Sequence, residues 1–82
     1  MKKKLRGDIN VSEMLKDARK CKGEVYISTD EGDILNLKSM LSQYVVVILA
    51  GQQELLKASY LVCEDNADDE IMKFYTQTNG GK

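Results

Sequence analysis

The sequence of 82 residues contains no histidine and no proline, and its two cysteines stand far apart, at Cys21 and Cys63. Without histidine, and without a Cys-x-x-Cys pair, the usual ligands of a zinc site are missing, so we expect no metal and no cofactor. The absence of proline removes the commonest helix breaker and any rigid linker. Because nothing in the sequence marks a secreted protein, we expect both cysteines to be reduced, half-buried thiols.

Other absences narrow the class of protein. The longest apolar run, residues 44–50, has seven residues, whereas a membrane-spanning helix needs ~20. The basic start of the chain resembles that of a signal peptide, but no apolar segment of the usual length follows it. The glycines form no phosphate-binding loop, and nothing resembles a nucleophile paired with a base. We therefore expect a soluble, cytoplasmic protein that is not an enzyme and is not inserted in a membrane.

Charge is nearly balanced overall but is unevenly distributed. The net charge is −1, so the whole molecule is not an electrostatic trap for nucleic acid. Residues 1–22 contain eight basic side chains and three acidic ones, whereas residues 64–70 are acidic. If these segments approach each other, their charges mostly cancel; if they do not, the basic half is a binding face for an acidic partner. The length fits one domain, which we place at residues 1–78, with a flexible tail at residues 79–82.

The first half of the sequence predicts a strand, a helix and a hairpin. Apolar residues alternate weakly over residues 1–9, which predicts a lysine-rich first strand that tolerates an edge position. Asn10, with Glu13 three residues later, has the spacing of a capping box. Apolar residues then recur at helical spacing, and Gly23 ends the helix. Residues 24–37 are typical of a β-hairpin, because β-branched and aromatic residues lead into an Asp-Glu-Gly-Asp turn.

The second half depends on what the apolar run becomes. We favour a helix over residues 39–50 that ends at a glycine, because apolar side chains recur there at helical spacing. The alternative is a buried strand over residues 44–49, since β-branched residues prefer strands, and residues 52–63 would then be helical. In the favoured version, residues 52–57 are a connection or the approach to a fourth strand at residues 58–63.

A last helix completes the predicted fold. Asn66 or Asp68 caps it, and acidic side chains in its first turn suit the positive end of the helix dipole. Its expected buried side consists of Ile71, Met72, Phe74 and Tyr75. The order is then β-α-β-β-α-β-α. This order predicts the α+β class, as an open-faced β-sandwich in which one antiparallel sheet carries its helices on one face.

Residues 36–41, Asn-Leu-Lys-Ser-Met-Leu, stand at the start of the second predicted helix. In this order of elements they resemble the signature around the regulatory serine of the HPr family, the histidine-containing phosphocarrier proteins of the bacterial sugar phosphotransferase system. Two other stretches are similar to that family: the first helix, which runs through Lys20 and Lys22 into a strand, and the acidic approach at residues 64–70. The resemblance spans nearly the whole chain and implies an HPr-like fold, although residues 42–57 are longer than the family's second-helix region.

The family's phosphoacceptor is missing. In the family it is a histidine at the start of the first helix, followed closely by an arginine and a proline. An ungapped match places Gly7, Ile9 and Asn10 at these three positions, with Asp8 between the first two. This degenerate loop offers no imidazole nitrogen that is nucleophilic near neutral pH, so the chain does not form phosphohistidine.

The family's regulatory serine matches Ser39. In the family a dedicated kinase phosphorylates this serine, and the modified protein is a corepressor for a transcription regulator. The resemblance therefore implies a regulatory or adaptor protein whose partners are phosphotransferase-system components, an HPr kinase or a transcription regulator. A phosphate at a helix N-terminus meets free N–H groups and the positive dipole end, and Lys38 adds a nearby cation. Equally, Ser39 fits a plain N-cap worth ~1 kcal/mol.

The resemblance also implies a docking surface for protein partners. Its apolar part is Met40, Leu41 and Tyr44, which equally fit a core, and its basic part is Arg19, Lys20 and Lys38. Two alternatives stay open. One is a degenerate relative used for assembly, which self-associates through the basic edge of the first strand. The other is a nucleic-acid-binding domain, which the net charge disfavours and for which one aromatic residue, Tyr26, is no stacking platform. Its basic residues are Lys2–Arg6, Arg19, Lys20 and Lys22.

Overall fold

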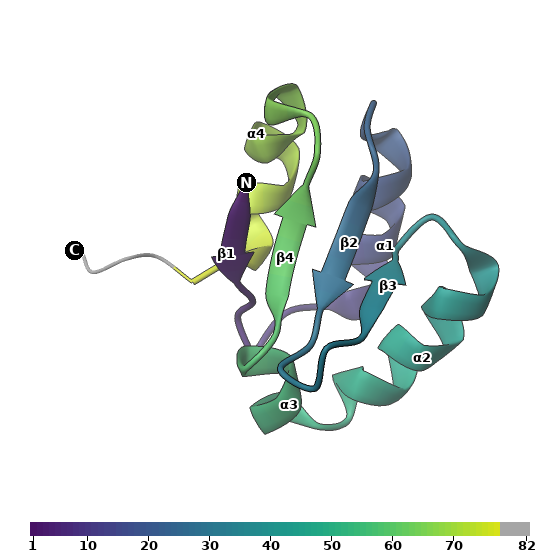
Figure 1. The fold of residues 1–82 in the computed structure, drawn as a ribbon, viewed down its shortest axis with the longest axis vertical. Coiled ribbons are helices and arrows are strands. Elements are labelled where there is room, and N and C mark those ends of the chain that lie inside the picture. The colour runs from purple at the N-terminus through teal and green to yellow at the C-terminus, as the bar shows by residue number, and fades with distance from the viewer. Residues whose placement is uncertain (78–82) are drawn as a thin grey trace.

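Four short antiparallel strands form one sheet in the order β1-β4-β2-β3 (Figure 1). The sheet belongs to a computed structural model that describes residues 1–77, so the predicted tail at residues 79–82 lies outside the described residues. Val62 stands opposite Lys2 on one side and Tyr26 on the other, which places β4 in the interior of the sheet. The strands are β1 (Lys2–Lys4), β2 (Val25–Ser28), β3 (Ile34–Asn36) and β4 (Tyr60–Cys63).

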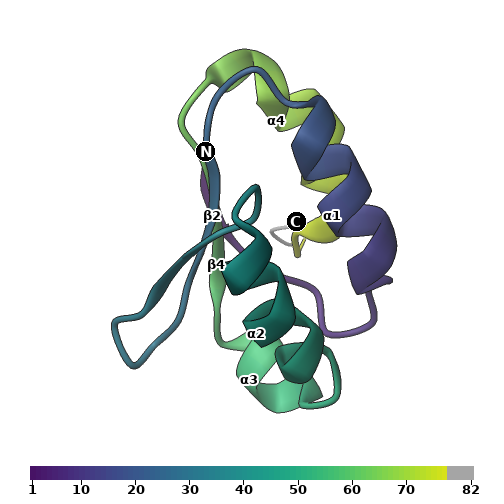
Figure 2. The same ribbon diagram turned by 90° about the vertical axis from the view of Figure 1, so that its right-hand side faces the viewer.

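The helices of the described chain lie against one face of the sheet and leave the other face open (Figure 2). They are α1 (Val11–Lys20), α2 (Met40–Ala50), α3 (Gln53–Lys57) and α4 (Asp69–Met72), with 3₁₀ turns η1 (Asn66–Asp68) and η2 (Lys73–Tyr75) on either side of α4. The α+β class and the open-faced β-sandwich are confirmed, with α3 as an additional element. Among residues 1–77, no helix combines the length and the apolar character needed to cross a bilayer.

The core lies between the sheet and the helices. In β2, Val25 and Ile27 are fully buried, whereas Tyr26 and Ser28 are half-buried on the open face. This alternation follows from the two-residue period of a strand, whose successive side chains point to opposite faces. The rest of the described chain adds further buried residues, which include Leu5, Met14, Ala18, Leu37, Val46, Leu56, Leu61 and Met72.

Cys21 and Cys63 are free thiols, as predicted, but they are buried rather than half-buried. The Cys21 thiol donates a hydrogen bond to the carbonyl oxygen of Asp17, with a distance of 3.4 Å. Burial raises the pKa of the Cys63 thiol to about 11 and also raises the pKa of Cys21. Both side chains therefore remain neutral near pH 7 and act as small packing residues.

Helix α1 begins where the sequence predicts and ends earlier. The Asn10 side chain accepts a hydrogen bond of 3.1 Å from the backbone N–H of Glu13, which confirms the predicted cap. The helix stops at Lys20, and the prediction that Gly23 ends it is wrong. Gly23 is needed for close packing instead, because a Cβ atom there would lie 2.9 Å from the Cβ of Asp65.

The apolar run forms helix α2, so the alternative of a strand at residues 44–49 is wrong. The interior positions of the sheet are taken by β4 and β2, each of which pairs on both sides. The run therefore packs on the sheet as a helix and buries Val46. Residues 53–57 are not an extended connection but helix α3, in which Leu56 is buried. Burial of one apolar side chain outweighs the weak local preference of so short a segment.

The predicted last helix is split into η1, α4 and η2. Met72 and Tyr75 are buried as predicted, but the prediction is wrong for Ile71 and for Phe74, which is 68% exposed. Residues three apart share a face in these tight turns, which brings Met72 and Tyr75 together. The Tyr75 hydroxyl donates a hydrogen bond to the Asp17 carboxylate and joins this segment to α1. Burial, followed by this hydrogen bond, raises the pKa of Tyr75 above its ordinary value.

The acidic residues before α4 hold the chain together across a distance in sequence. The sequence predicted that Asn66 or Asp68 caps the last helix. Asp68 occupies the N-cap position of α4, but within residues 1–77 its side chain forms no capping hydrogen bond, and Asn66 lies inside η1. The buried carboxylate of Asp68 accepts hydrogen bonds from the backbone N–H groups of Lys22 and Gly23, at 2.9 and 2.8 Å. These bonds, that from Gly23 first, lower the pKa of Asp68. Asp65 caps η1 through a hydrogen bond of 2.9 Å from Ala67 N–H.

Candidate docking site on helix α2

The junction between β3 and α2 is fixed by backbone and side-chain hydrogen bonds. Leu37 is fully buried, and its N–H donates to the carbonyl oxygen of Val25 at 2.8 Å. The Asn36 side chain accepts from the N–H of Lys38 at 2.8 Å and donates to the Glu24 carboxylate. The Asn36 carbonyl accepts from the N–H of Ser39 at 3.0 Å. The chain therefore enters α2 at a defined position.

Ser39 occupies the N-cap of α2, as predicted, with extended backbone angles of φ −85° and ψ 129°. Its carbonyl oxygen accepts from the N–H of Gln43 at 3.0 Å. Within residues 1–77, however, its side chain forms no capping hydrogen bond. The Gln43 side chain secures the helix start instead, by donating to the Leu37 carbonyl at 3.0 Å. Ser39 is half-buried. Its hydroxyl thus lies at a helix N-terminus but does not accept the capping hydrogen bond that an N-cap serine usually accepts from a backbone N–H.

The outer side of α2 is apolar and faces solvent. The helix contains no Asp, Glu, Lys or Arg, and Val46 is buried on the inner side. Leu41 is 77% exposed and Ile48 is 65% exposed. Met40, Leu41 and Tyr44, which fitted either a docking patch or a core in the sequence, are therefore not part of the core. We call this exposed set the apolar face; it consists of Met40, Leu41, Tyr44, Val45, Val47 and Ile48.

Basic side chains border the N-terminal half of the apolar face. The Arg19 guanidinium of α1 donates to the side-chain oxygen of Gln43 at 3.0 Å, which places a cation beside α2. The Lys38 ammonium reaches back to the carbonyl oxygen of Cys21 at 2.8 Å, where it neutralises the negative end of α1. Lys20 forms an exposed ion pair with Asp17 at 3.4 Å. Of the three predicted basic residues, Arg19 is therefore the one that contacts α2 through a hydrogen bond.

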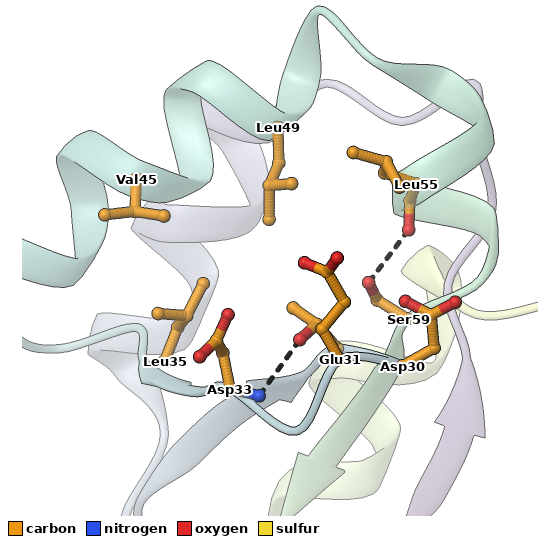
Figure 3. A pocket seen from close by; sticks show the side chains of 9 residues that line it. Asp30, Glu31, Asp33, Leu35, Val45, Leu49, Leu55 and Ser59 are labelled. Atoms are coloured by element: carbon orange, nitrogen blue, oxygen red, sulfur yellow. Dashed lines mark hydrogen bonds between the residues drawn. The ribbon is translucent and has the colours of Figure 1, made fainter.

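Acidic side chains lie near the C-terminal half of α2. Val45 and Leu49 face the β2–β3 turn across a small hollow of about 70 Å³, with Leu35 and Leu55 at its sides (Figure 3). The carboxylates of Asp30, Glu31 and Asp33 line the same hollow. The sequence pattern predicts a turn at these residues and no binding role. The signal that could have included it in the site is three acidic residues among four, ahead of an apolar helix.

Hydrogen bonds close the backbone of the β2–β3 turn, which carries these carboxylates. The N–H of Asp33 donates to the Thr29 hydroxyl at 3.1 Å (Figure 3). The N–H of Thr29 donates to the Asp33 carbonyl at 2.9 Å. Gly32 has φ +94°, a conformation that other residues adopt at a cost, which confirms its predicted role. The β2–β3 turn is therefore a hydrogen-bonded hairpin turn that lies beside α2.

The residues of the degenerate loop Gly7–Asn10 take part in ion pairing, packing and helix capping. Arg6 donates to both carboxylate oxygens of Asp8, at 3.0 and 2.9 Å, and this hydrogen-bonded pair lowers the pKa of Asp8. A Cβ at Gly7 would lie 2.6 Å from Cγ of Lys57, so the loop packs closely on α3. Ile9 packs on the core and Asn10 caps α1. This loop precedes α1, whereas Arg19 near the other end of α1 contacts α2, so the length of α1, about 15 Å, lies between them.

Compared with family models, curated proteins and solved structures, the chain matches none of them.

Proposed function

We propose that this chain is an HPr-like regulatory or adaptor domain that binds protein partners through α2 and does not transfer phosphate through histidine. The observation that carries the proposal is the apolar face, an exposed and uncharged helix surface that starts at Ser39. The α+β fold with helices on one face of an open antiparallel sheet agrees with the fold that the resemblance to the HPr family implies. The partners we propose are phosphotransferase-system components, an HPr kinase or a transcription regulator.

The size of the apolar face supports a docking role. At the exposures of its six side chains, the face presents roughly 700 Å² of mostly apolar surface, above the ~300–600 Å² of the largest patch on a typical monomer. Exposing such a surface has no benefit for folding, because apolar groups gain by leaving water. A partner that covers it supplies the missing burial.

The N-terminus of α2 supports regulation at Ser39. The first N–H groups of a helix have no partner inside the helix and carry the positive end of its dipole. A phosphate on Ser39 would accept hydrogen bonds from them while adding negative charge at the edge of the apolar face. The two buried thiols fit a reducing cytoplasm, which is where we place the protein.

The test is phosphorylation of the purified chain by an HPr kinase with ATP, followed by mapping of the phosphate by mass spectrometry. We expect one phosphate on Ser39 and none on the variant Ser39→Ala. An authentic HPr in the same tube shows that the kinase is active. If that HPr is labelled while Ser39 stays unmodified, the regulatory part of the proposal is wrong.

One observation favours nucleic-acid binding as a second candidate function. Tyr60 lies on the open face of the sheet, next to the strand that carries Tyr26, so this face holds two tyrosines rather than one. The ammonium groups of Lys2 and Lys4 lie 5.2 and 5.9 Å from the Tyr60 ring centre. Fluorescence anisotropy with labelled single-stranded RNA tests this candidate: binding should weaken steeply with salt and on Tyr60→Ala. No binding at low salt removes it.

A further inference from the structure

The charges around the apolar face are arranged as two poles. Arg19 forms a basic pole beside the N-terminal half of α2, where it contacts Gln43. Asp30, Glu31 and Asp33 form an acidic pole beside the C-terminal half, opposite Val45 and Leu49 (Figure 3). The dipole of α2 has the same sense, with its positive end at Ser39. The apolar face therefore lies between a positive and a negative end.

A surface of this kind is complementary to itself after a half-turn. If a twofold axis lies in the plane of the face, perpendicular to the line that joins the poles, the basic pole of each copy meets the acidic pole of the other. We propose that the occupant of the apolar face is a second copy of this chain, which forms a twofold-symmetric homodimer through α2. This inference rests on the proposed function in one respect, since it names the partner at the same docking face.

The exposed area of the apolar face is close to the area that each subunit of a stable dimer buries. The apolar face presents roughly 700 Å² before the poles are counted, close to the ~800 Å² that each partner buries in a standard stable interface. Its centre is apolar and aromatic, with Tyr44 between Leu41 and Ile48 on the helix surface, and its charges lie at the rim. This is the arrangement that protein interfaces favour.

Other surfaces offer less to a second copy. Strand β1, the edge predicted as an alternative site of self-association, is three residues long and consists of lysines. Short, lysine-rich edge strands disfavour pairing with another strand. The open face of the sheet carries one strongly exposed aliphatic residue, Ile34, so it provides a control rather than a competing interface.

Sedimentation velocity from micromolar to millimolar concentration tests the proposal on the whole chain. We expect a monomer–dimer equilibrium that Ile48→Glu weakens about 100-fold, because it places a charge at the centre of the interface. Ile34→Glu is the matched control: Ile34 is 67% exposed and Ile48 is 65% exposed, and we expect no change. Circular dichroism shows that both variants are folded. A monomer at every concentration, or dissociation caused by Ile34→Glu and not by Ile48→Glu, overturns the proposal.

Charge exchange tests the twofold arrangement itself. Arg19→Glu alone and Glu31→Arg alone should each weaken the dimer by roughly 10-fold, since every dimer contains the altered contact twice. A mixture of the two variants should dimerise as the natural chain does, because both contacts in the mixed dimer are then between opposite charges. Failure of the mixture to recover overturns the pairing of poles.

The outcome is separable from that of the proposed function. Ser39 labelled by the kinase in a chain that is always a monomer removes the homodimer and leaves the regulatory proposal intact. A dimer that obeys the Ile48 and charge-exchange tests while Ser39 stays unlabelled removes the regulation at Ser39 and leaves the homodimer. Each experiment therefore rejects one proposal without the other.

Discussion

Replacing Val46 and Val47 by alanine, one at a time, tests how α2 sits on the sheet. Both changes remove the same two methyl groups from adjacent positions of one helix, so their local effects on the helix are nearly equal. Val46 is fully buried, whereas Val47 is 56% exposed. The difference between the two variants therefore reports burial alone.

The magnitudes follow from these exposures. Removing two buried carbons from Val46 costs roughly 2 kcal/mol in burial and cavity formation. Alanine returns about 0.5 kcal/mol in helix propensity, so the net loss for Val46→Ala is about 1.5 kcal/mol. In a domain of this size this lowers the melting temperature by roughly 6–12 °C. For Val47→Ala the propensity gain offsets the small burial loss, and we expect a change within about 0.5 kcal/mol.

The assay is thermal and urea denaturation of dilute protein, at concentrations where a dimer through α2 has dissociated. A third variant, Ile48→Ala, separates helix from strand. In a strand, Val46 and Ile48 share a face, so both variants would be strongly destabilised. In α2, Ile48 is on the outer side and its variant should be nearly neutral. Equal destabilisation by the Val46 and Val47 variants, or by the Val46 and Ile48 variants, would refute this placement of α2.

Further predictions concern the caps, the buried carboxylate and the thiols. Asn10→Ala should destabilise the protein by about 1 kcal/mol in urea denaturation, whereas Ser39→Ala, which removes no capping bond, should have a much smaller effect. The pKa of Asp68 is lowered from 3.8, so its contribution is complete above pH 3.8 and is lost as the pH falls through the lower folded value. Asp68→Asn should therefore flatten the acid limb of stability against pH. Cys21 and Cys63 should resist alkylation by iodoacetamide at pH 8 until urea unfolds the chain, and labelling in native protein would contradict their burial.

The elements that follow local rules could be predicted from the sequence. Helix α1 starts at a side-chain cap, Asn10, and buries an apolar stripe, so composition and spacing agree. The β2–β3 hairpin follows from Gly32 and its acidic neighbours, because a positive φ is needed there. Together with β4 (Tyr60–Cys63), which was predicted at residues 58–63, these elements form the single antiparallel sheet that was expected.

The remaining elements depend on contacts that no local pattern contains. Helix α3 has Gln52 at its N-cap without a side-chain capping bond, and its stability comes from burying Leu56. The carboxylate of Asp68 binds Lys22 and Gly23, far away in sequence, and no spacing rule connects them. Apart from Ser42 and Gln43, every residue of α2 is apolar, so periodicity could not separate Val46, which is core, from Leu41, which is surface.

The contrast between α1 and α2 locates the functional surface on physical grounds. Helix α1 satisfies every local rule: a side-chain cap, helical spacing of its apolar residues and basic residues in its last turn. Helix α2 breaks several at once, because its β-branched residues, Val45 and Ile48 among them, face water and its N-cap serine forms no side-chain capping bond within residues 1–77. A sequence folds to one structure when local and global preferences agree, and conflicts are concentrated where function requires them. The conflicts in α2 disappear if a second protein surface covers the apolar face and a phosphate takes up the free N–H groups at Ser39, so the two proposals explain features that folding alone leaves costly.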